Sequence, residues 1–175
     1  MNYFELFELP LSYTISQKDL TTAYYALSRQ WHPDRYTTAG PDKQSKAMEM
    51  SSRINEGYQT LKDTTKRLHH ILQILHAAPQ EGQEKMPQSF LMEMMDINEA
   101  IMDHKMDPSP ESEKQITDMV GGMEAELHSE IEVITTGLEF ASPDAQKVES
   151  LKDAYLRSKY LKRLKDNIAD KEADI

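Results

Sequence analysis

A histidine and an aspartate that stand two residues apart, His32 and Asp34, are the side chains in this sequence best suited to chemistry. Together they could act as an acid–base pair. A hydrolase built on such a pair also needs a nucleophile and an oxyanion site, and the sequence has no Cys, no nucleophile elbow and no glycine-rich loop. We therefore predict that the chain is not an enzyme and that the pair serves recognition. Pro33 stiffens the backbone, Asp34 offers a carboxylate to a partner arginine, and His32 presents a hydrogen-bond donor or acceptor.

Two helical patterns flank the His32–Asp34 pair. Ser16 is a candidate N-cap for the first, and Pro33 must end it, because proline denies its predecessor the helical backbone region and has no N–H to donate. The apolar stripe of this helix consists of Leu20, Tyr24, Leu27 and Trp31. The second stripe follows a breaker at residues 40–42 and consists of Met48, Ser51, Ile54, Asn55, Tyr58 and Leu61. The sequence predicts an antiparallel helical hairpin that presents His32 and Asp34 at an exposed connection.

The segment from residue 90 onward carries two different faces. A core stripe, whose members fall within about 60° on a helical wheel, consists of Phe90, Met94, Ile97 and Ile101. A second face mixes apolar and acidic residues: Leu91, Met92, Met95, Asp96, Glu99, Met102 and Asp103. One interpretation is a broad core stripe in a helical bundle. The other is a binding surface, because burial would penalise the carboxylates and Met is used at adaptable binding surfaces.

Two longer helices are predicted beyond this segment. Ser109-Pro110 opens the first, whose apolar residues have the spacing of packed antiparallel helices: Ile116, Val120, Met123, Leu127, Ile131, Ile134 and Leu138. Gly121-Gly122 interrupts this pattern, so we expect a close helix contact or a bend there. Ser142-Pro143-Asp144 opens the last helix in the same way, with a buried side made of Val148, Leu151, Tyr155, Leu161, Leu164 and Ile168.

Charge and composition narrow the possible partners. The net charge is -10, and it is uneven: residues 1–76 carry 9 Lys+Arg against 8 Asp+Glu, whereas residues 77–175 carry 11 against 22. So acidic a half disfavours nucleic acid and anionic membrane and suits a basic protein partner. No apolar run reaches the roughly 18 residues of a membrane span, and Glu5 and Glu8 interrupt the N-terminus where a secretory signal would be apolar. We expect a cytoplasmic protein.

No metal, cofactor or small-molecule site is predicted. Without Cys, the chain has no thiolate to hold zinc or an iron–sulfur cluster, and its six His residues show no ligand spacing. The adjacent His69 and His70 would point about 100° apart on a helix, which is a poor geometry for one metal ion.

The helical hairpin with His-Pro-Asp at its bend resembles a J-domain, the module that stimulates ATP hydrolysis by DnaK-type chaperones. Several stretches are also similar to one branch of these proteins, the iron–sulfur co-chaperone family HscB: residues 2–10, 24–34, 54–61, 90–93 and 159–161. The resemblance implies an all-α, two-domain fold in an L-shaped or dumbbell arrangement. We expect the J-domain hairpin over residues 1–76, a linker over 77–86, and a scaffold-binding three-helix bundle over 87–175.

The resemblance also implies functional residues. In similar J-domains the helix before the motif docks on an acidic chaperone surface, and this chain has Lys18 and Arg29 on that helix. Arg35 adds a charge beside the motif formed by His32, Pro33 and Asp34. Family positions that contact the iron–sulfur scaffold protein IscU match Leu91, Met92, Met95, Asp96 and Glu99. We add Asp103 from the same face, and Tyr160, which matches a family aromatic that joins the scaffold-binding surface.

The function that the resemblance implies is that of a co-chaperone in iron–sulfur cluster assembly. The bundle would bind IscU, and the His-Pro-Asp connection would stimulate ATP hydrolysis by the specialised DnaK-type chaperone HscA. Two alternatives remain from the sequence. The chain could be a J-domain co-chaperone for a different client, or a helical adaptor with no chaperone role.

Overall fold

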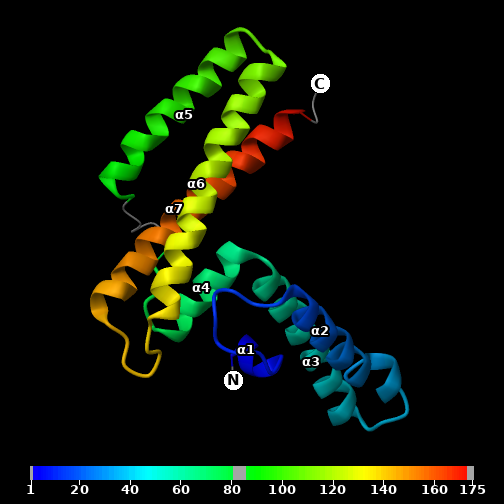
Figure 1. The fold of residues 1–175 in the computed structure, drawn as a ribbon. Helices are drawn as coiled ribbons and strands as arrows, with labels where there is room; N and C mark the ends of the chain where they lie inside the picture. The colour runs from blue at the N-terminus through cyan, green and yellow to red at the C-terminus, as the bar shows by residue number, and fades with distance from the viewer. Residues whose placement is uncertain (1, 81–85, 173–175) are drawn as a thin grey trace. The chain divides into compact units, whose positions relative to one another are not determined.

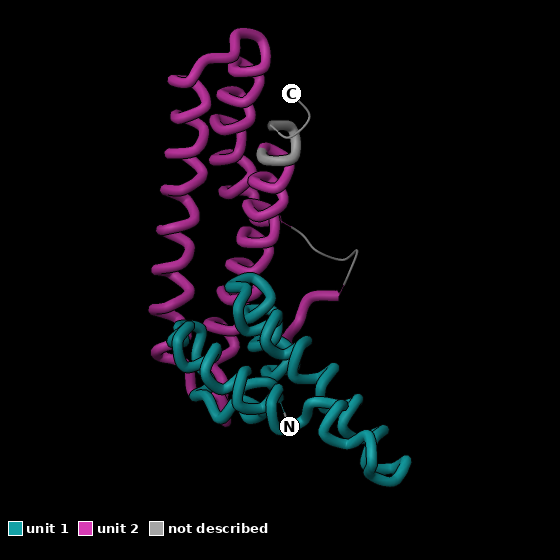
Figure 2. The backbone as a smooth tube through the Cα atoms, turned by 90° about the vertical axis from the view of Figure 1, so that its right-hand side faces the viewer, with its two compact units in different colours: residues 1–76 teal, residues 77–175 magenta. Residues whose placement is uncertain are grey.

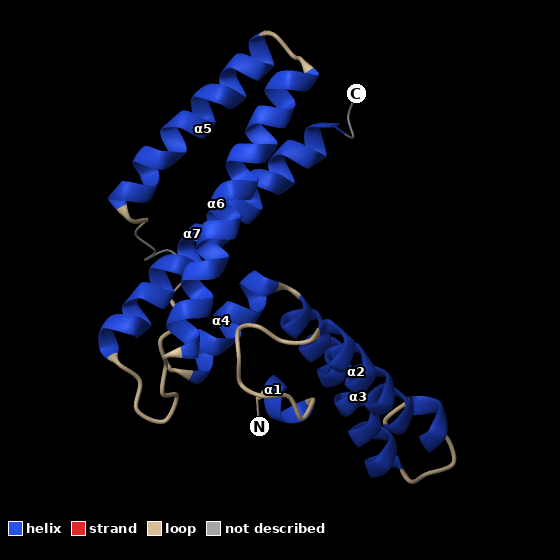
Figure 3. Ribbon diagram, in the orientation of Figure 1, coloured by secondary structure: helices blue, strands red, loops and turns tan. Residues whose placement is uncertain are grey.

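The computed structural model describes residues 2–80 and 86–172, and within these ranges every regular element is a helix, which confirms the predicted all-α fold (Figure 1, Figure 3). The chain divides into two compact units, residues 1–76 and residues 77–175 (Figure 2). Part of the predicted linker over 77–86 lies outside the described residues, because residues 81–85 belong to it. The last three residues of the predicted bundle domain lie outside them as well.

Unit 1 is built on a hairpin of two helices, α2 (Gln17–Gln30) and α3 (Pro41–Lys62), and their connection contains the short 3₁₀ helix η1 (Pro33–Tyr36) (Figure 1). The first helix, α1 (Tyr3–Leu6), and the fourth, α4 (Thr64–Ile74), both pack against α3. The core lies between these helices, and its side chains are at most 6% exposed: Phe4, Leu6, Phe7, Tyr13, Leu20, Ala47, Ile54, Leu61, Leu68, Ile71 and Leu72.

Side-chain caps fix where the helices of unit 1 begin. Asn2 and Glu5 form a reciprocal capping box at the start of α1. The Oγ of Ser16 accepts a hydrogen bond from the third residue of α2 over 3.2 Å, and the Oδ1 of Asp63 accepts one from the third residue of α4 over 2.9 Å. Each cap satisfies a backbone N–H that has no partner within its own helix. The predicted N-cap at Ser16 is therefore confirmed.

The buried face of α3 differs from the predicted stripe at two positions, Met48 and Asn55, which are both exposed. Met48 is 64% exposed, and the neighbouring Ala47 is fully buried in its place. The buried residues Ala47, Ile54 and Leu61 recur every seven residues, and Met48 lies about 100° from that line on the helix. We predicted burial of Met48 because it is large and apolar, but its position on the helix places it outside the buried line.

Close packing of α1 explains a glycine in the middle of α3. A Cβ atom added to Gly57 would lie 2.8 Å from Cδ1 of Tyr3 and 2.9 Å from Cε2 of Phe7. Both distances are shorter than van der Waals contact, so a larger residue here would push α1 away. Gly57 thus allows the N-terminal aromatic residues to cover the hairpin.

Unit 2 is a bundle of three helices, α5 (Gln88–Met106), α6 (Pro110–Thr136) and α7 (Ala145–Glu172), in which α6 packs against both of the others (Figure 1). Its core side chains are at most 9% exposed: Phe90, Met94, Ile97, Ile116, Val120, Leu127, Ile131, Leu138, Leu151, Ala154, Tyr155, Leu156 and Leu161. The predicted three-helix bundle is confirmed, and so is most of the predicted core.

Two local expectations in unit 2 are not met. The close helix contact expected at Gly121 and Gly122 is absent, because both are exposed and a Cβ atom on either would meet no atom within 4 Å. The alternative, a bend at these residues, stays a prediction. The last helix begins at Ala145 and not after Ser142. Asp144 precedes the first turn directly, and its Oδ1 accepts the N–H of Lys147 over 2.9 Å, so Asp144 takes the capping role that the prediction gave to Ser142.

Candidate functional site

The connection between α2 and α3 presents His32 and Asp34 to solvent. His32 precedes η1, and its Nδ1 accepts a hydrogen bond from the backbone N–H of Asp34 over 3.3 Å. The two side chains are 57% and 85% exposed, so neither belongs to a core. Because Nδ1 accepts, the neutral imidazole carries its proton on Nε2, where it can be donated to another molecule.

Two side chains that follow the motif fasten it to the end of α2. Nη1 of Arg35 donates to the carbonyl oxygen of Arg29 over 3.0 Å. The hydroxyl of Tyr36 donates to the carbonyl oxygen of Gln30 over 3.2 Å. Carbonyl groups in the last turn of a helix have no intrahelical partner, so both bonds satisfy acceptors that α2 leaves open. The ring of Tyr36 also stacks on that of Trp31, with centroids 6.0 Å apart. Arg35, predicted to supply a docking charge, is thus also a brace of the connection.

The start of α3 holds the connection from its other side. Nε2 of Gln44 donates to the carbonyl oxygens of Thr37 and Ala39, over 3.1 and 2.8 Å. The hydroxyl of Thr37 in turn donates to the carbonyl oxygen of Asp34 over 3.2 Å. The roles of Gln44 and Tyr36 cannot be predicted from the sequence. Both stand in a polar stretch without periodicity, so no pattern distinguishes a side chain that holds the connection from one that only contacts solvent.

The two bases predicted for docking lie on the outer side of α2. Lys18 and Arg29 are exposed, whereas Leu20 is completely buried. Nε of Arg29 makes a long hydrogen bond, 3.4 Å, to the carbonyl oxygen of Tyr25 one turn earlier. The hairpin therefore carries a basic helix face and the exposed His32–Asp34 connection together. Partner binding by these residues stays a prediction.

Helix α5 has one buried side and one exposed side that is also apolar. Phe90, Met94 and Ile97 are 1–2% exposed, whereas Leu91 is 47% and Met92 and Met95 are each 67% exposed. We define the acidic–apolar face of α5 as the exposed residues Leu91, Met92, Met95, Asp96, Glu99, Met102 and Asp103. A broad core stripe would have buried these residues, so that interpretation is wrong for this face.

The acidic–apolar face continues to the end of α5. Met102 is 64% exposed, and Met106, which the sequence analysis did not single out, is 84% exposed. Apolar side chains with that much exposure lose little water contact within unit 2, so they contribute little to its folding. They are available to a partner, although binding there stays a prediction.

Tyr160 lies on α7 and contacts the buried side of α5. Its ring meets that of Phe90 edge to face, with centroids 5.6 Å apart and planes at 89°. Tyr160 is neither fully buried nor fully exposed. Since Phe90 directly precedes Leu91, the contact places Tyr160 beside the first turn of α5, where the acidic–apolar face begins. Its predicted part in binding remains a prediction.

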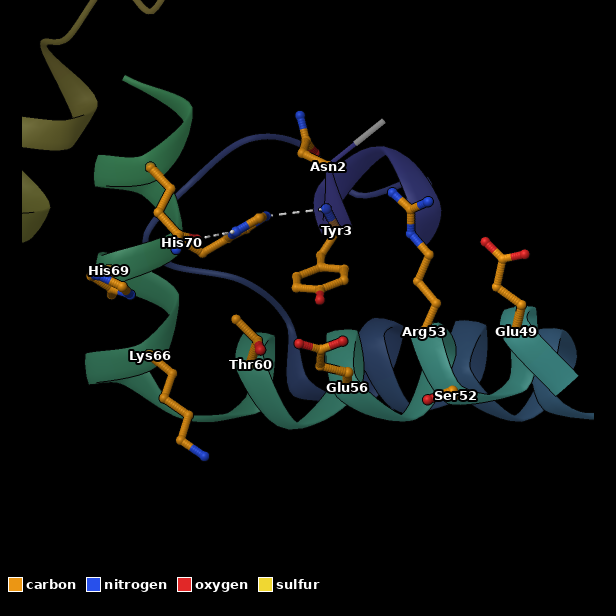
Figure 4. Close-up of a pocket in the computed structure, with 11 residues that line it drawn as sticks. Asn2, Tyr3, Glu49, Ser52, Arg53, Glu56, Thr60, Lys66, His69 and His70 are labelled. Atoms are coloured by element: carbon orange, nitrogen blue, oxygen red, sulfur yellow. Dashed lines mark hydrogen bonds between the residues drawn. The ribbon is translucent and has the colours of Figure 1, made fainter. Parts of the chain in front are cut away.

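Unit 1 also contains a polar hollow of about 830 Å³, lined by residues of α1, α3 and α4 (Figure 4). His70 lies at one side of it, where Nε2 accepts the backbone N–H of Tyr3 over 3.1 Å and the ring stacks on Phe4. Burial lowers the pKa of His70, which keeps the ring neutral and able to accept this bond. The charged residues that face the hollow have both signs: Glu49, Arg53, Glu56 and Lys66.

Within residues 2–80 and 86–172, no three His, Cys, Asp or Glu side chains are grouped closely enough to hold a metal ion. Among the helices of these described ranges, none combines the length and the apolarity that a membrane span requires. The exposed residues described above offer hydrogen bonds, charges and apolar contacts, which are the means of protein recognition.

Comparison with known families gives two matches that lie in different units. Residues 2–70 match the DnaJ domain, and residues 86–169 match the HSCB C-terminal oligomerisation domain. One curated relative is the co-chaperone protein HscB homolog of Chromobacterium violaceum. It is 33% identical over 141 residues, which cover 80% of this chain and 75% of the relative.

Solved structures give the same answer for the fold. The chaperone HscB from Vibrio cholerae is similar over 99% of both chains, with a TM-score of 0.79 and 26% sequence identity. The human co-chaperone protein HscB has a TM-score of 0.83 over all of this chain and 84% of its own. Its sequence identity is 22%, so that likeness concerns the fold alone.

Proposed function

Because this chain belongs to the HscB family of J-domain co-chaperones, we propose that it couples the iron–sulfur scaffold protein IscU to the DnaK-type chaperone HscA in the cytoplasm. The His32-Pro33-Asp34 connection and the basic face of α2 bind HscA and stimulate its ATP hydrolysis. The acidic–apolar face of α5 binds IscU. The cluster is the cargo of the scaffold, and it takes no ligand from this chain.

The chaperone end of the proposal is supported by the fixed geometry of the connection. Asp34 projects a carboxylate that is 85% exposed from a loop that both α2 and α3 hold by hydrogen bonds. A carboxylate on a fixed loop suits a bidentate contact with an arginine, because less conformational freedom is lost when the contact forms. Nε2–H of His32 adds a donor beside it.

The scaffold end is carried by one observation: α5 leaves Leu91, Met92 and Met95 in solvent although its other side fills the core. Flexible Met side chains adapt to a partner surface, and the interleaved carboxylates of Asp96 and Glu99 would attract basic residues around it. The acidic charge of residues 77–175 favours a basic partner over nucleic acid.

The proposal is tested by measuring IscU binding and stimulation of HscA ATP hydrolysis on the same variants. The double variant Leu91→Ala/Met92→Ala should weaken binding to purified IscU at least tenfold, since two exposed apolar anchors are lost. In the absence of IscU, its stimulation of HscA ATP hydrolysis should equal that of the wild type. Val133→Ala, which truncates another exposed apolar residue, here on α6 and 71% exposed, is the matched control and should leave both measurements unchanged.

Two outcomes would contradict the division of labour. One is wild-type IscU binding by the double variant, and the other is an equal loss of IscU binding and of ATPase stimulation. A pull-down with the intact chain separates the alternatives further. Retention of a different client without IscU would indicate another J-domain pathway, and failure to raise the turnover of any DnaK-type chaperone would indicate an adaptor.

A further inference from the structure

An exposed tyrosine stands in the middle of the basic face of α2. Tyr25 is 60% exposed, close to the 67% of Met92 and Met95. At about 100° per residue, Lys18, Thr22, Tyr25 and Arg29 fall within about 60° of one another around the helix. The ring therefore lies between two bases, and burial within unit 1 does not account for it.

The ring of Tyr25 is supported from below by other aromatic rings. It tilts against Tyr24, with centroids 5.5 Å apart, and Tyr24 stacks on Tyr58 of α3 at 4.2 Å. The hydroxyl of Tyr24 donates to Oδ1 of Asn55 over 2.9 Å, which fixes the middle ring of the series. A supported aromatic ring loses little freedom when a partner covers it, so its burial contributes more fully to affinity.

We propose that Tyr25 is the apolar anchor with which this chain docks on its DnaK-type chaperone. This role rests on the proposed function, and it assigns the short-range apolar contact of α2 to Tyr25. The surface that receives Tyr25 is an apolar depression on the chaperone that is surrounded by carboxylates. The ring enters the depression, while Lys18 and Arg29 pair with the rim.

Charge and position both favour this occupant. The two bases flanking Tyr25 require an acidic surface, and an isolated acidic surface would gain nothing from an exposed ring. Tyr25 is seven residues before His32 along the same hairpin, about 10 Å by helical rise. A partner that covers the His32–Asp34 connection and continues along α2 would therefore meet Tyr25. Tyr is also among the residues that most often dominate binding at the centre of an interface.

The test titrates HscA with the intact chain and records both the half-maximal concentration and the maximal ATPase rate. Tyr25→Ala should raise the half-maximal concentration about tenfold or more and leave the maximal rate unchanged, because the His32–Asp34 connection is intact. Tyr25→Phe keeps the ring and should stay within about twofold of the wild type. Val133→Ala is again the control for loss of an exposed apolar side chain.

The salt dependence of binding distinguishes the contribution of Tyr25 from that of Lys18 and Arg29. Between about 50 mM and about 500 mM salt, the ratio between Tyr25→Ala and wild type should hold, because apolar contact is not screened. The ratio between Lys18→Ala/Arg29→Ala and wild type should shrink over the same range. If Tyr25→Ala matches the wild type while the wild type stimulates HscA, this inference alone fails. If the wild type does not stimulate HscA at all, the proposed function fails with it.

Discussion

The Nδ1 atom of His32 accepts a hydrogen bond from the backbone N–H of Asp34 over 3.3 Å. The backbone of Asp34 therefore orients the exposed imidazole beside the Asp34 carboxylate. The bond assigns the two ring nitrogens different tasks. Nδ1 caps the start of η1, and Nε2 is left as a hydrogen-bond donor on an exposed ring.

This arrangement predicts the behaviour of His32→Asn. An asparagine oxygen caps a helix start as Nδ1 does here, but its side chain has no group at the position of Nε2. We expect the melting temperature to stay within a few degrees of the wild type and the maximal stimulation of HscA to fall by more than tenfold. Retained stimulation would show that the ring serves only as a cap.

Two adjacent methionines on α5 should separate stability from binding. Met94 is 2% exposed and Met95 is 67% exposed. Met94→Ala should lower the free energy of unfolding of unit 2 by about 2–5 kcal/mol, since it leaves a cavity in the core. Met95→Ala should change it by less than about 0.5 kcal/mol and should weaken IscU binding. Urea unfolding and a binding titration on both variants check the pair, and a reversed pattern would refute our assignment of the two sides of α5.

A buried arginine ties three segments of unit 1 together. Arg67 is 3% exposed, and its guanidinium donates to the carbonyl oxygens of Leu61 and Tyr13, each over 2.6 Å. Burial lowers the pKa of Arg67 from its ordinary value, yet the paired carbonyls keep the charge satisfied. Arg67→Met would leave two buried acceptors without donors.

We expect Arg67→Met to lower the free energy of unfolding of unit 1 by about 3 kcal/mol, from roughly 1–3 kcal/mol for each unsatisfied group. Its exposed neighbour supplies the control, and Lys66→Met should change stability by less than about 0.5 kcal/mol. Trp31 is the only tryptophan in the chain, so its fluorescence reports the unfolding of this unit alone. Equal effects of the two variants would mean that the Arg67 hydrogen bonds contribute nothing measurable.

His70 should make the stability of unit 1 depend on pH. Its folded-state pKa is lowered by burial, so between that pKa and the ordinary value of about 6.5 the unfolded chain binds a proton that the folded chain does not. Stability is therefore complete above about pH 6.5 and falls as the pH drops through this window. Protonation also removes the acceptor for the N–H of Tyr3. The other titratable and charged residues around the same hollow are Lys66, His69, Arg53, Glu49 and Glu56 (Figure 4).

The matched variant is His70→Gln, which offers an amide oxygen at every pH. Between about pH 7 and about pH 5, the free energy of unfolding measured by Trp31 fluorescence should fall less for His70→Gln than for the wild type. The comparison cancels the contributions of the other His residues. Parallel curves for the two proteins would contradict a linkage through His70.

Much of the fold is predictable from local signals. Ser16 and Ser109 cap their helices as their types and positions indicate, because an N-cap needs only a side-chain oxygen beside the first turn. The two sides of α5 also follow from helical spacing. The exposure of Leu91, Met92 and Met95 is settled only by the structure, since an apolar side chain gives no sign of whether another helix covers it.

What the sequence does not reveal depends on contacts between distant segments. Arg67 looks like any surface base, and its burial becomes understandable only when the carbonyl of Tyr13, 54 residues away, lies beside it. The aromatic support of Tyr25 is of the same kind, because Tyr24 and Tyr58 meet only through the packing of α2 on α3.

The central claim is that the carboxylate of Asp34 acts on HscA while a separate unit holds IscU. Asp34→Asn is close in shape, keeps the backbone N–H that His32 accepts, and removes only the charge. The decisive measurement is the steady-state ATPase rate of HscA with each chain at saturation, with IscU binding measured on the same preparations. We predict that Asp34→Asn leaves HscA at its basal rate and binds IscU as the wild type does, and wild-type stimulation by Asp34→Asn would contradict the account.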